Sequence, residues 1–101
     1  MATFIATYDL KWSQTTPYSE FKEQAQKLGW ASWILAGNRK WYKLPNTTLE
    51  GTFASMEAAE KAFLAIAGAT AAATGRIVEV EKWIIAEYSS ARFNSNEQRN
   101  A

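Results

Sequence analysis

The sequence predicts an α+β fold of the ferredoxin-like type, a βαββαβ sandwich with a four-stranded antiparallel sheet and two helices on one face. Two segments have the residue spacing of amphipathic helices, and extended segments surround them in that order. The chain has 101 residues, 48% of them hydrophobic, which is enough for one core and too few for two domains. We expect residues 1–90 to form this domain and residues 91–101 to be a polar, mobile tail.

The first strand and the first helix have the clearest signals. Residues 3–10 are apolar and β-prone on both faces, which is typical of an inner strand. Thr16 followed by Pro17 predicts a helix start, with a hydroxyl cap and a proline in the first helical position. Apolar residues then recur at helical spacing as far as Leu28, and Gly29 predicts the helix end.

The middle of the chain is less regular. Residues 30–35 and 40–44 are extended runs separated by an Ala-Gly-Asn-Arg turn signal, and Pro45 ends the second run. We therefore expect the second strand somewhere within residues 30–44, with room for a protruding hairpin. The third strand is expected over Thr47–Phe53.

The second helix and the last strand follow. Ser55 predicts a helix cap, an apolar stripe continues at helical spacing, and Gly75 predicts the helix end. The last strand is expected over residues 77–88, with Trp83 and Ile85 on the sheet face that no helix covers. A homodimer, formed face to face or edge to edge, would cover that apolar face.

The composition removes several kinds of chemistry. The chain has no cysteine and no histidine, which excludes disulfides, thiolate zinc sites and Ser-His-Asp or Cys-His catalysis. The formal net charge of +1 gives no bulk attraction to nucleic acid, so such binding needs local patches. The chain shows neither signal-peptide features nor an apolar run of membrane-spanning length. We expect a cytoplasmic protein of a prokaryote or its phage, without a membrane partner.

Asp9 is the candidate metal ligand and catalytic residue. It lies at the carboxyl end of the predicted inner strand, and its carboxylate suits a hard ion such as Mg²⁺ or Mn²⁺. Two copies supplied by symmetry would hold one ion and activate a water against a phosphate. Alternatively, Asp9 caps the following loop through backbone N–H groups. Tyr8 beside it either orients a phosphate or belongs to the core with its hydroxyl at the rim.

A second candidate site is the Arg39–Lys43 segment, in which basic and aromatic residues are interleaved. Its cations would follow phosphates and its rings would stack on bases, whereas the alternative, which we favour, is a charged edge hairpin with the aromatics packed as core. Of the five tryptophans, we expect Trp30 or Trp33 in the core, and Trp12 and Trp41 at the surface. The candidate binding residues for nucleic acid or another ligand are Lys11, Trp12, Arg39, Lys40, Trp41 and Lys43.

The first strand ends in Tyr8-Asp9-Leu10, and the third expected strand leads through Phe53 into the cap of the second helix. These features and the order of elements resemble the CRISPR-associated adaptation-subunit nucleases and the virulence-associated D (VapD) ribonuclease toxins, over about residues 2–88. The resemblance implies a homodimer in which Asp9 of each subunit binds a divalent ion for phosphodiester cleavage. Where those families often continue with an arginine or other polar residues, this chain has Lys11, Trp12 and Ser13.

Three functions are therefore open at the level of sequence. The first is a dimeric protein acting on nucleic acid, as a metal-dependent endonuclease if Asp9 is catalytic. The second is a non-catalytic binding or inhibitor module of a phage or mobile element, which sequesters a nucleotide or blocks a host protein. The third is a cofactorless dimeric α+β-barrel enzyme with an apolar pocket between sheet and helices, against which the absence of histidine counts.

Overall fold

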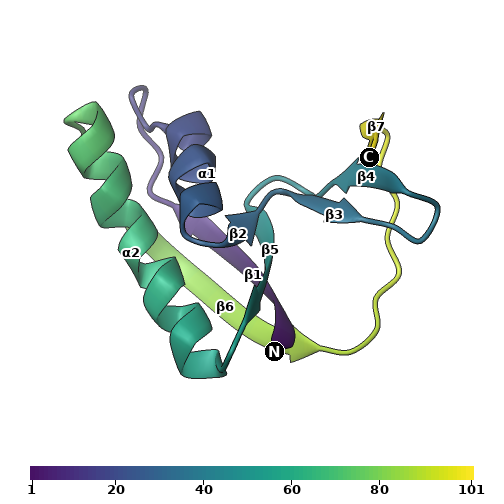
Figure 1. Ribbon diagram of the computed structural model, residues 1–101. Coiled ribbons are helices and arrows are strands. Elements are labelled where there is room, and N and C mark those ends of the chain that lie inside the picture. Colours follow the sequence, from purple (N-terminus) through teal and green to yellow (C-terminus); the bar gives the residue numbers. More distant parts are fainter.

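The computed structural model describes all 101 residues and contains two helices and two antiparallel sheets (Figure 1). The α+β class predicted from the sequence is confirmed. One sheet has four strands in the order β2-β5-β1-β6, and the other has three strands in the order β3-β4-β7. The elements are β1 (Ala2–Leu10), α1 (Tyr18–Lys27), β2 (Trp30–Ala31), β3 (Trp33–Leu35), β4 (Lys40–Lys43), β5 (Thr48–Phe53), α2 (Met56–Thr74), β6 (Val80–Tyr88) and β7 (Gln98–Asn100).

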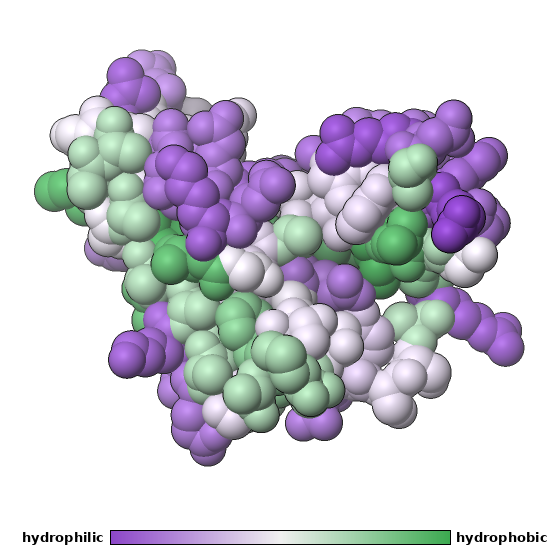
Figure 2. Space-filling view, in the orientation of Figure 1, coloured by the Kyte–Doolittle hydropathy of each residue, from purple (hydrophilic) through white to green (hydrophobic).

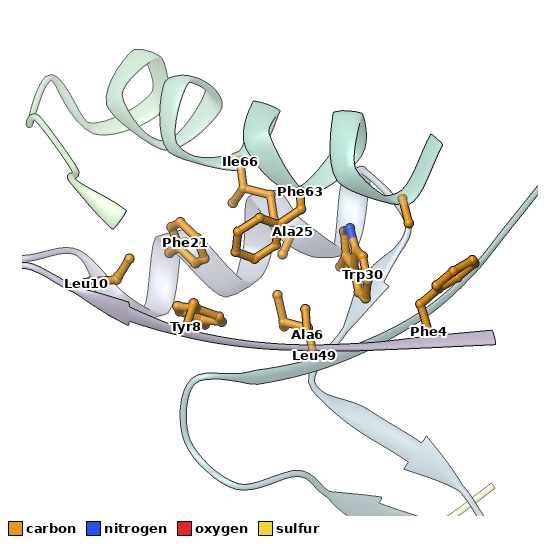
Figure 3. Packing of buried hydrophobic residues seen from close by; sticks show 11 residues of the cluster. Phe4, Ala6, Tyr8, Leu10, Phe21, Ala25, Trp30, Leu49, Phe63 and Ile66 are labelled. Carbon is orange, nitrogen blue, oxygen red and sulfur yellow. The ribbon is translucent and has the colours of Figure 1, made fainter. Parts of the chain in front are cut away.

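Both helices cover the same face of the four-stranded sheet, and the core lies between them (Figures 1 and 3). Alternate residues of β1 point at the helices, as the period of a strand requires. Phe63 of α2 and Trp30 of β2 meet edge to face, with ring centroids 6.2 Å apart. Burying each such side chain stabilises the fold by about 1.5–3 kcal/mol. The buried cluster is Phe4, Ala6, Tyr8, Leu10, Phe21, Ala25, Trp30, Leu49, Ala59, Phe63 and Ile66.

The start of α1 differs from the prediction. The helix begins at Tyr18 after Pro17, and no side chain caps it. The Thr16 hydroxyl instead accepts a hydrogen bond from the Ser13 N–H (2.8 Å) and donates one to the Lys11 carbonyl (3.1 Å). The loop before the helix thus uses the hydroxyl that was expected to cap it, and so the capping prediction is wrong.

The other helix boundaries agree with the sequence. Gly29 follows α1 with a φ of +99°, a value that L side chains rarely adopt. At α2 the Ser55 hydroxyl accepts a hydrogen bond from the Ala58 N–H at 3.1 Å. Gly75 ends α2 in the left-handed conformation, and its N–H donates to the Ala71 carbonyl at 2.8 Å. The predicted cap at Ser55 and the predicted end at Gly75 are both confirmed.

The faces of β6 correct a further prediction. Tyr8 of β1 points at the helices and pairs with Trp83, and Ile85 pairs with the equally buried Ala6. Trp83 and Ile85 therefore face the helices and not the uncovered side, because directly paired residues point the same way. A bulge between Asp9 and Leu10 adds one residue on β6, which the simple alternation expected from the sequence did not include.

The hairpin within residues 30–44 protrudes, and it does so as part of a second sheet. β3 and β4 pair with each other, and β7 from the C-terminal segment pairs with β4. Residues 91–101 were expected to be a polar tail without a strand, but Gln98–Asn100 form β7. In Figure 1 this small sheet projects beyond β2 and β5, on the opposite side from α2.

Candidate functional site

Asp9 lies on the uncovered face of the four-stranded sheet. Its side chain is exposed, and it pairs across the strands with Lys82. The two residues border a shallow hollow of about 200 Å³, together with Thr7 and Ile84. No group of three or more metal-ligating side chains occurs in the molecule. A divalent ion at Asp9 would need carboxylates from another subunit, and the Lys82 ammonium would compete with it electrostatically.

Tyr8 points away from Asp9. Its side chain is buried against the helices, with its ring centroid 4.9 Å from that of Phe21 and 5.8 Å from that of Phe63. Burial raises the pKa of the Tyr8 phenol to about 12 because the charged form loses its hydration. Of the two roles considered for Tyr8, its position is that of a core residue and not of a group beside Asp9.

Lys11 and Trp12 follow β1 in the loop before α1. The Lys11 N–H donates to the Glu79 carbonyl at 2.9 Å, which continues the pairing of β1 with the β6 side. Trp12 is 70% exposed, as predicted. In Figure 1 this loop and the three-stranded sheet lie on either side of α1. The structure therefore does not bring Lys11 and Trp12 together with the Arg39–Lys43 segment.

The Arg39–Lys43 segment forms the hairpin tip and β4. β4 is the central strand of its sheet and not an edge, so the predicted edge hairpin is wrong in that respect. Arg39 lies in the turn with a φ of +63°, and the next residue, Lys40, is exposed. Trp41 and Lys43 share one face of the sheet, because they are two residues apart on a strand.

The same face of the three-stranded sheet collects two tryptophans and two cations. Trp33 pairs with Lys43, and Trp41 pairs with both Leu35 and Arg99, so all five residues point the same way. The Arg99 guanidinium lies 4.1 Å from the centroid of the Trp33 ring, and the Lys43 ammonium lies 5.3 Å from it. Both distances fit cation–π interactions, which hold β7 and β4 against β3.

This face borders a groove that α1 closes on the other side. One hollow of about 500 Å³ lies beside Trp33, Trp41 and Arg99, and it also includes Gln26 of α1. A second hollow of about 330 Å³ shares Gln26 and continues along α1 past Lys22 and Lys43. Figure 2 shows the molecule hollowed between its helical part and the part formed by the small sheet. We call this the tryptophan groove and define it by Lys22, Gln26, Ser32, Trp33, Trp41, Lys43 and Arg99.

Lys22 of α1 and Lys43 of β4 place positive charges on the two walls of the groove. The Lys22 ammonium donates to the Asn46 side-chain oxygen at 2.9 Å. Partial burial lowers the Lys22 pKa, the nearby Lys43 lowers the pKa further, and Glu97 opposes the change. A lowered lysine pKa means that the surroundings do not fully replace the hydration that the charged ammonium has lost. An anion beside Lys22 and Lys43 would supply that compensation, although Glu23 on the same side of the groove contributes a negative charge.

Only two residues of the tryptophan groove were identified as binding residues from the sequence. Trp41 and Lys43 were predicted as binding residues, whereas Trp33 was an alternative to Trp30 for the core. Trp30 is the fully buried one, and Trp33 is half-buried. The pairing of residues 33–35 with 41–43 would have placed Trp33 beside Lys43. No pattern in the sequence pointed to Arg99, because a three-residue polar strand has no recognisable periodicity.

An apolar cavity of about 420 Å³ lies between the uncovered face of the large sheet, the hairpin and residues 90–94. Ile5, Ile34 and Phe93 contribute to its lining. The cofactorless α+β-barrel enzyme would need a pocket between sheet and helices, where this molecule has its packed core.

Neither helix combines the length and the apolar character that crossing a bilayer requires.

Comparison of the chain with protein-family models, with curated proteins and with solved structures finds no match.

Proposed function

We propose that this protein binds single-stranded nucleic acid in the tryptophan groove. The observation that carries the proposal is the joint placement of Trp33 and Trp41 with Lys43 and Arg99 on one face of the small sheet. Trp33 and Trp41 are diagonal neighbours across two strands, a spacing of about 7–8 Å at the backbone. Indole faces stack on bases of any identity, and the flanking cations contact phosphates, which is the general chemistry of single-strand binding.

The groove favours a single strand over a duplex for a physical reason. The indole rings gain stacking energy only from bases whose faces are free, and the bases of a duplex are already stacked. Cations on both walls, Lys22 from α1 and Lys43 from β4, would follow a backbone that runs along the groove.

The strand order β2-β5-β1-β6 supports a ferredoxin-like βαββαβ unit for the large sheet, with the β3–β4 hairpin inserted between its second and third strands.

Fluorescence anisotropy with labelled oligonucleotides tests the proposal. Single-stranded RNA and DNA should bind more tightly than duplexes of the same length. Trp41→Ala should weaken binding by about five- to hundredfold, since stacking contributes about 1–3 kcal/mol per base. Trp12→Ala is the matched control, because Trp12 is an exposed tryptophan outside the groove. Absence of binding to any oligonucleotide, or equal losses in both variants, would contradict the proposal. The first of these results would favour the protein-binding or inhibitor function.

Cleavage is the catalytic form of this proposal, and it rests on the exposed Asp9 at the end of an inner strand. It assigns hydrolysis to a Mg²⁺ or Mn²⁺ ion held by Asp9 carboxylates from two subunits. Incubation of the same oligonucleotides with metal or with EDTA, using wild type and Asp9→Ala, decides between binding alone and cleavage. Activity that needs both the ion and Asp9 supports the nuclease. Intact oligonucleotides in the presence of folded wild-type protein leave binding as the function.

A further inference from the structure

β6 is the outer strand of the large sheet, and none of its residues borders the tryptophan groove. β6 has nine residues and pairs only with β1, so the N–H and C=O groups on its other side meet no strand. A long unpaired edge of this kind is a template for another strand. Proteins that remain monomeric usually protect such an edge with a short strand, a proline, charged side chains, a bulge or a covering element. β6 contains no proline, and its charged residues and its bulge lie outside its central residues 83–86.

The side chains in the middle of this edge, residues 83–86, are apolar on both faces of the sheet. Trp83 is 40% exposed on the helix side, and Ile84 is 60% exposed on the uncovered side. The apolar surface continues onto α2, because Phe63 contacts Trp83 with ring centroids 5.7 Å apart and the adjacent Leu64 is 55% exposed. Residues 62–74 of α2 contain no charged side chain, although several of them face solvent.

We propose that β6 pairs antiparallel with β6 of a second copy of this chain, which joins the two large sheets into one of eight strands. A second copy is the occupant because its strand is complementary to itself by symmetry. The two-fold axis is perpendicular to the sheet, so both sets of helices lie on the same side of the joined sheet. The exposed apolar surfaces around Leu64 then lie on the same side, next to the seam.

The charges on β6 and the length of strand that can pair select the register. An axis at Ile84 would place Glu81 opposite Glu87 of the other copy, and an axis at Lys82 would place that lysine opposite itself. An axis at Trp83 would place Glu79 opposite Glu87. Axes at Ile85 and Ala86 oppose no like charges, but the axis at Ile85 pairs residues 82–88 of β6 and the axis at Ala86 pairs only residues 84–88. Since directly opposed like charges destabilise a strand pair, we assign the axis to Ile85.

This arrangement separates the two Asp9 carboxylates. Asp9 is level with Lys82, three residues from the axis, and two β6 strands lie between the two copies of β1. With strand spacing near 4.8 Å and a rise near 3.3 Å per residue, the two Asp9 residues lie about 24 Å apart. They share no metal ion in this dimer, whereas a face-to-face dimer would bring them close. The small sheet lies beyond β2 and β5 (Figure 1), so the two small sheets and the tryptophan grooves beside them lie at opposite ends of the joined sheet.

The first test is the mass of the full chain in solution by sedimentation equilibrium. The expected mass is twice 11.3 kDa. Ile84→Lys places two new ammonium groups diagonally across the seam and should raise the dimer dissociation constant by at least about tenfold. Leu35→Lys is the matched control, because Leu35 is 51% exposed on the small sheet. Circular dichroism checks that both variants are folded. A monomeric wild type at the highest soluble concentration would overturn the proposal.

The second test locates the seam. Because the chain has no cysteine, single cysteines can be introduced without background disulfides. Ile85→Cys should cross-link to its symmetry mate under mild oxidation, because directly opposed Cβ atoms lie about 4.5–5.5 Å apart. Thr7→Cys on the uncovered face should not cross-link. Cross-linking through Thr7 with none through Ile85, or a dimer that is unchanged by Ile84→Lys, would overturn the edge pairing in favour of a face-to-face dimer.

Discussion

The large sheet and the small sheet are stabilised in different ways. The large sheet packs against two helices, and eleven buried hydrophobic residues fill the space between them. The small sheet contains only Ile34 among its buried residues, and it is held by Trp33 with its two cations and by an edge-to-face contact of Tyr42 with Phe93. One region therefore carries the fold, while the other presents aromatic rings and cations that the core does not use.

The largest difference should appear when one phenylalanine is removed from each region. Phe63→Ala empties a fully enclosed site and should lower the free energy of unfolding by about 3–5 kcal/mol. Phe93→Ala removes a ring that is 39% exposed beside the small sheet and should cost about 1 kcal/mol. Urea denaturation followed by circular dichroism measures both values. Equal losses would show that the two sheets unfold as one unit with a shared core.

The same contrast explains what could be predicted from the sequence. β1, α1 and α2 have local signals, because their periodicity and the residues Ser55 and Gly75 depend only on near neighbours in the chain. The faces of β6 depend on the bulge beside Leu10, and a one-residue shift reverses every side chain. β7 depends on pairing with β4, some sixty residues earlier in the chain, and nothing in its three polar residues encodes that partner.

The candidate site divides in the same way. Trp41 and Lys43 were recognised because they are adjacent in the sequence, and Arg99 was missed because only the fold brings it to Trp33. The predicted pair Tyr8 and Asp9 is separated by the alternation of β1, which sends adjacent residues to opposite faces. Neighbouring positions in the sequence therefore indicated which residue types the site contains, but not which residues lie close together in the fold.

A second prediction uses the buried phenol of the large sheet. Tyr8 in the unfolded chain loses its proton near its ordinary pKa of 10.0, but in the fold only near 12. Unfolding therefore releases a proton between these values. The stability from the neutral Tyr8 is fully present below pH 10 and falls as the pH rises towards 12. Urea titrations at several alkaline pH values should show a shallower fall for Tyr8→Phe than for wild type.

Part of the alkaline fall should remain in Tyr8→Phe. Burial raises the pKa of Tyr88 as well, and its hydroxyl hydrogen-bonds the Glu50 carboxylate, which raises that pKa further. Tyr88 therefore contributes in the same direction over a similar alkaline range. An identical pH dependence in wild type and Tyr8→Phe would mean that the Tyr8 hydroxyl is hydrated in the folded protein.

A smaller effect is expected at the junction of β7 with β3. Arg99→Ala removes the guanidinium that stacks on Trp33 and should cost about 0.5–1 kcal/mol, confined to the small sheet. Hydrogen exchange should show faster exchange for β4 amides and unchanged exchange in β1. Arg92→Ala is the control, because Arg92 is exposed outside the groove. Faster exchange in both sheets would contradict the independence of the small sheet.

The smallest expected effect concerns salt, and it tests whether binding belongs to the small sheet and its groove. Three groove cations, Lys22, Lys43 and Arg99, predict that the logarithm of the association constant for single strands falls with the logarithm of salt concentration with a slope of about 2. Lys43→Ala should reduce that slope by about 0.7, and Lys11→Ala should leave it unchanged. Lys11 has the same charge and belongs to the β1–α1 loop, which lies on the other side of α1 from the small sheet (Figure 1). If both lysines change the slope equally, the backbone of the bound strand also crosses the β1–α1 loop. The division between a region that folds and a region that binds would then be wrong, and Trp12 would belong to the interface.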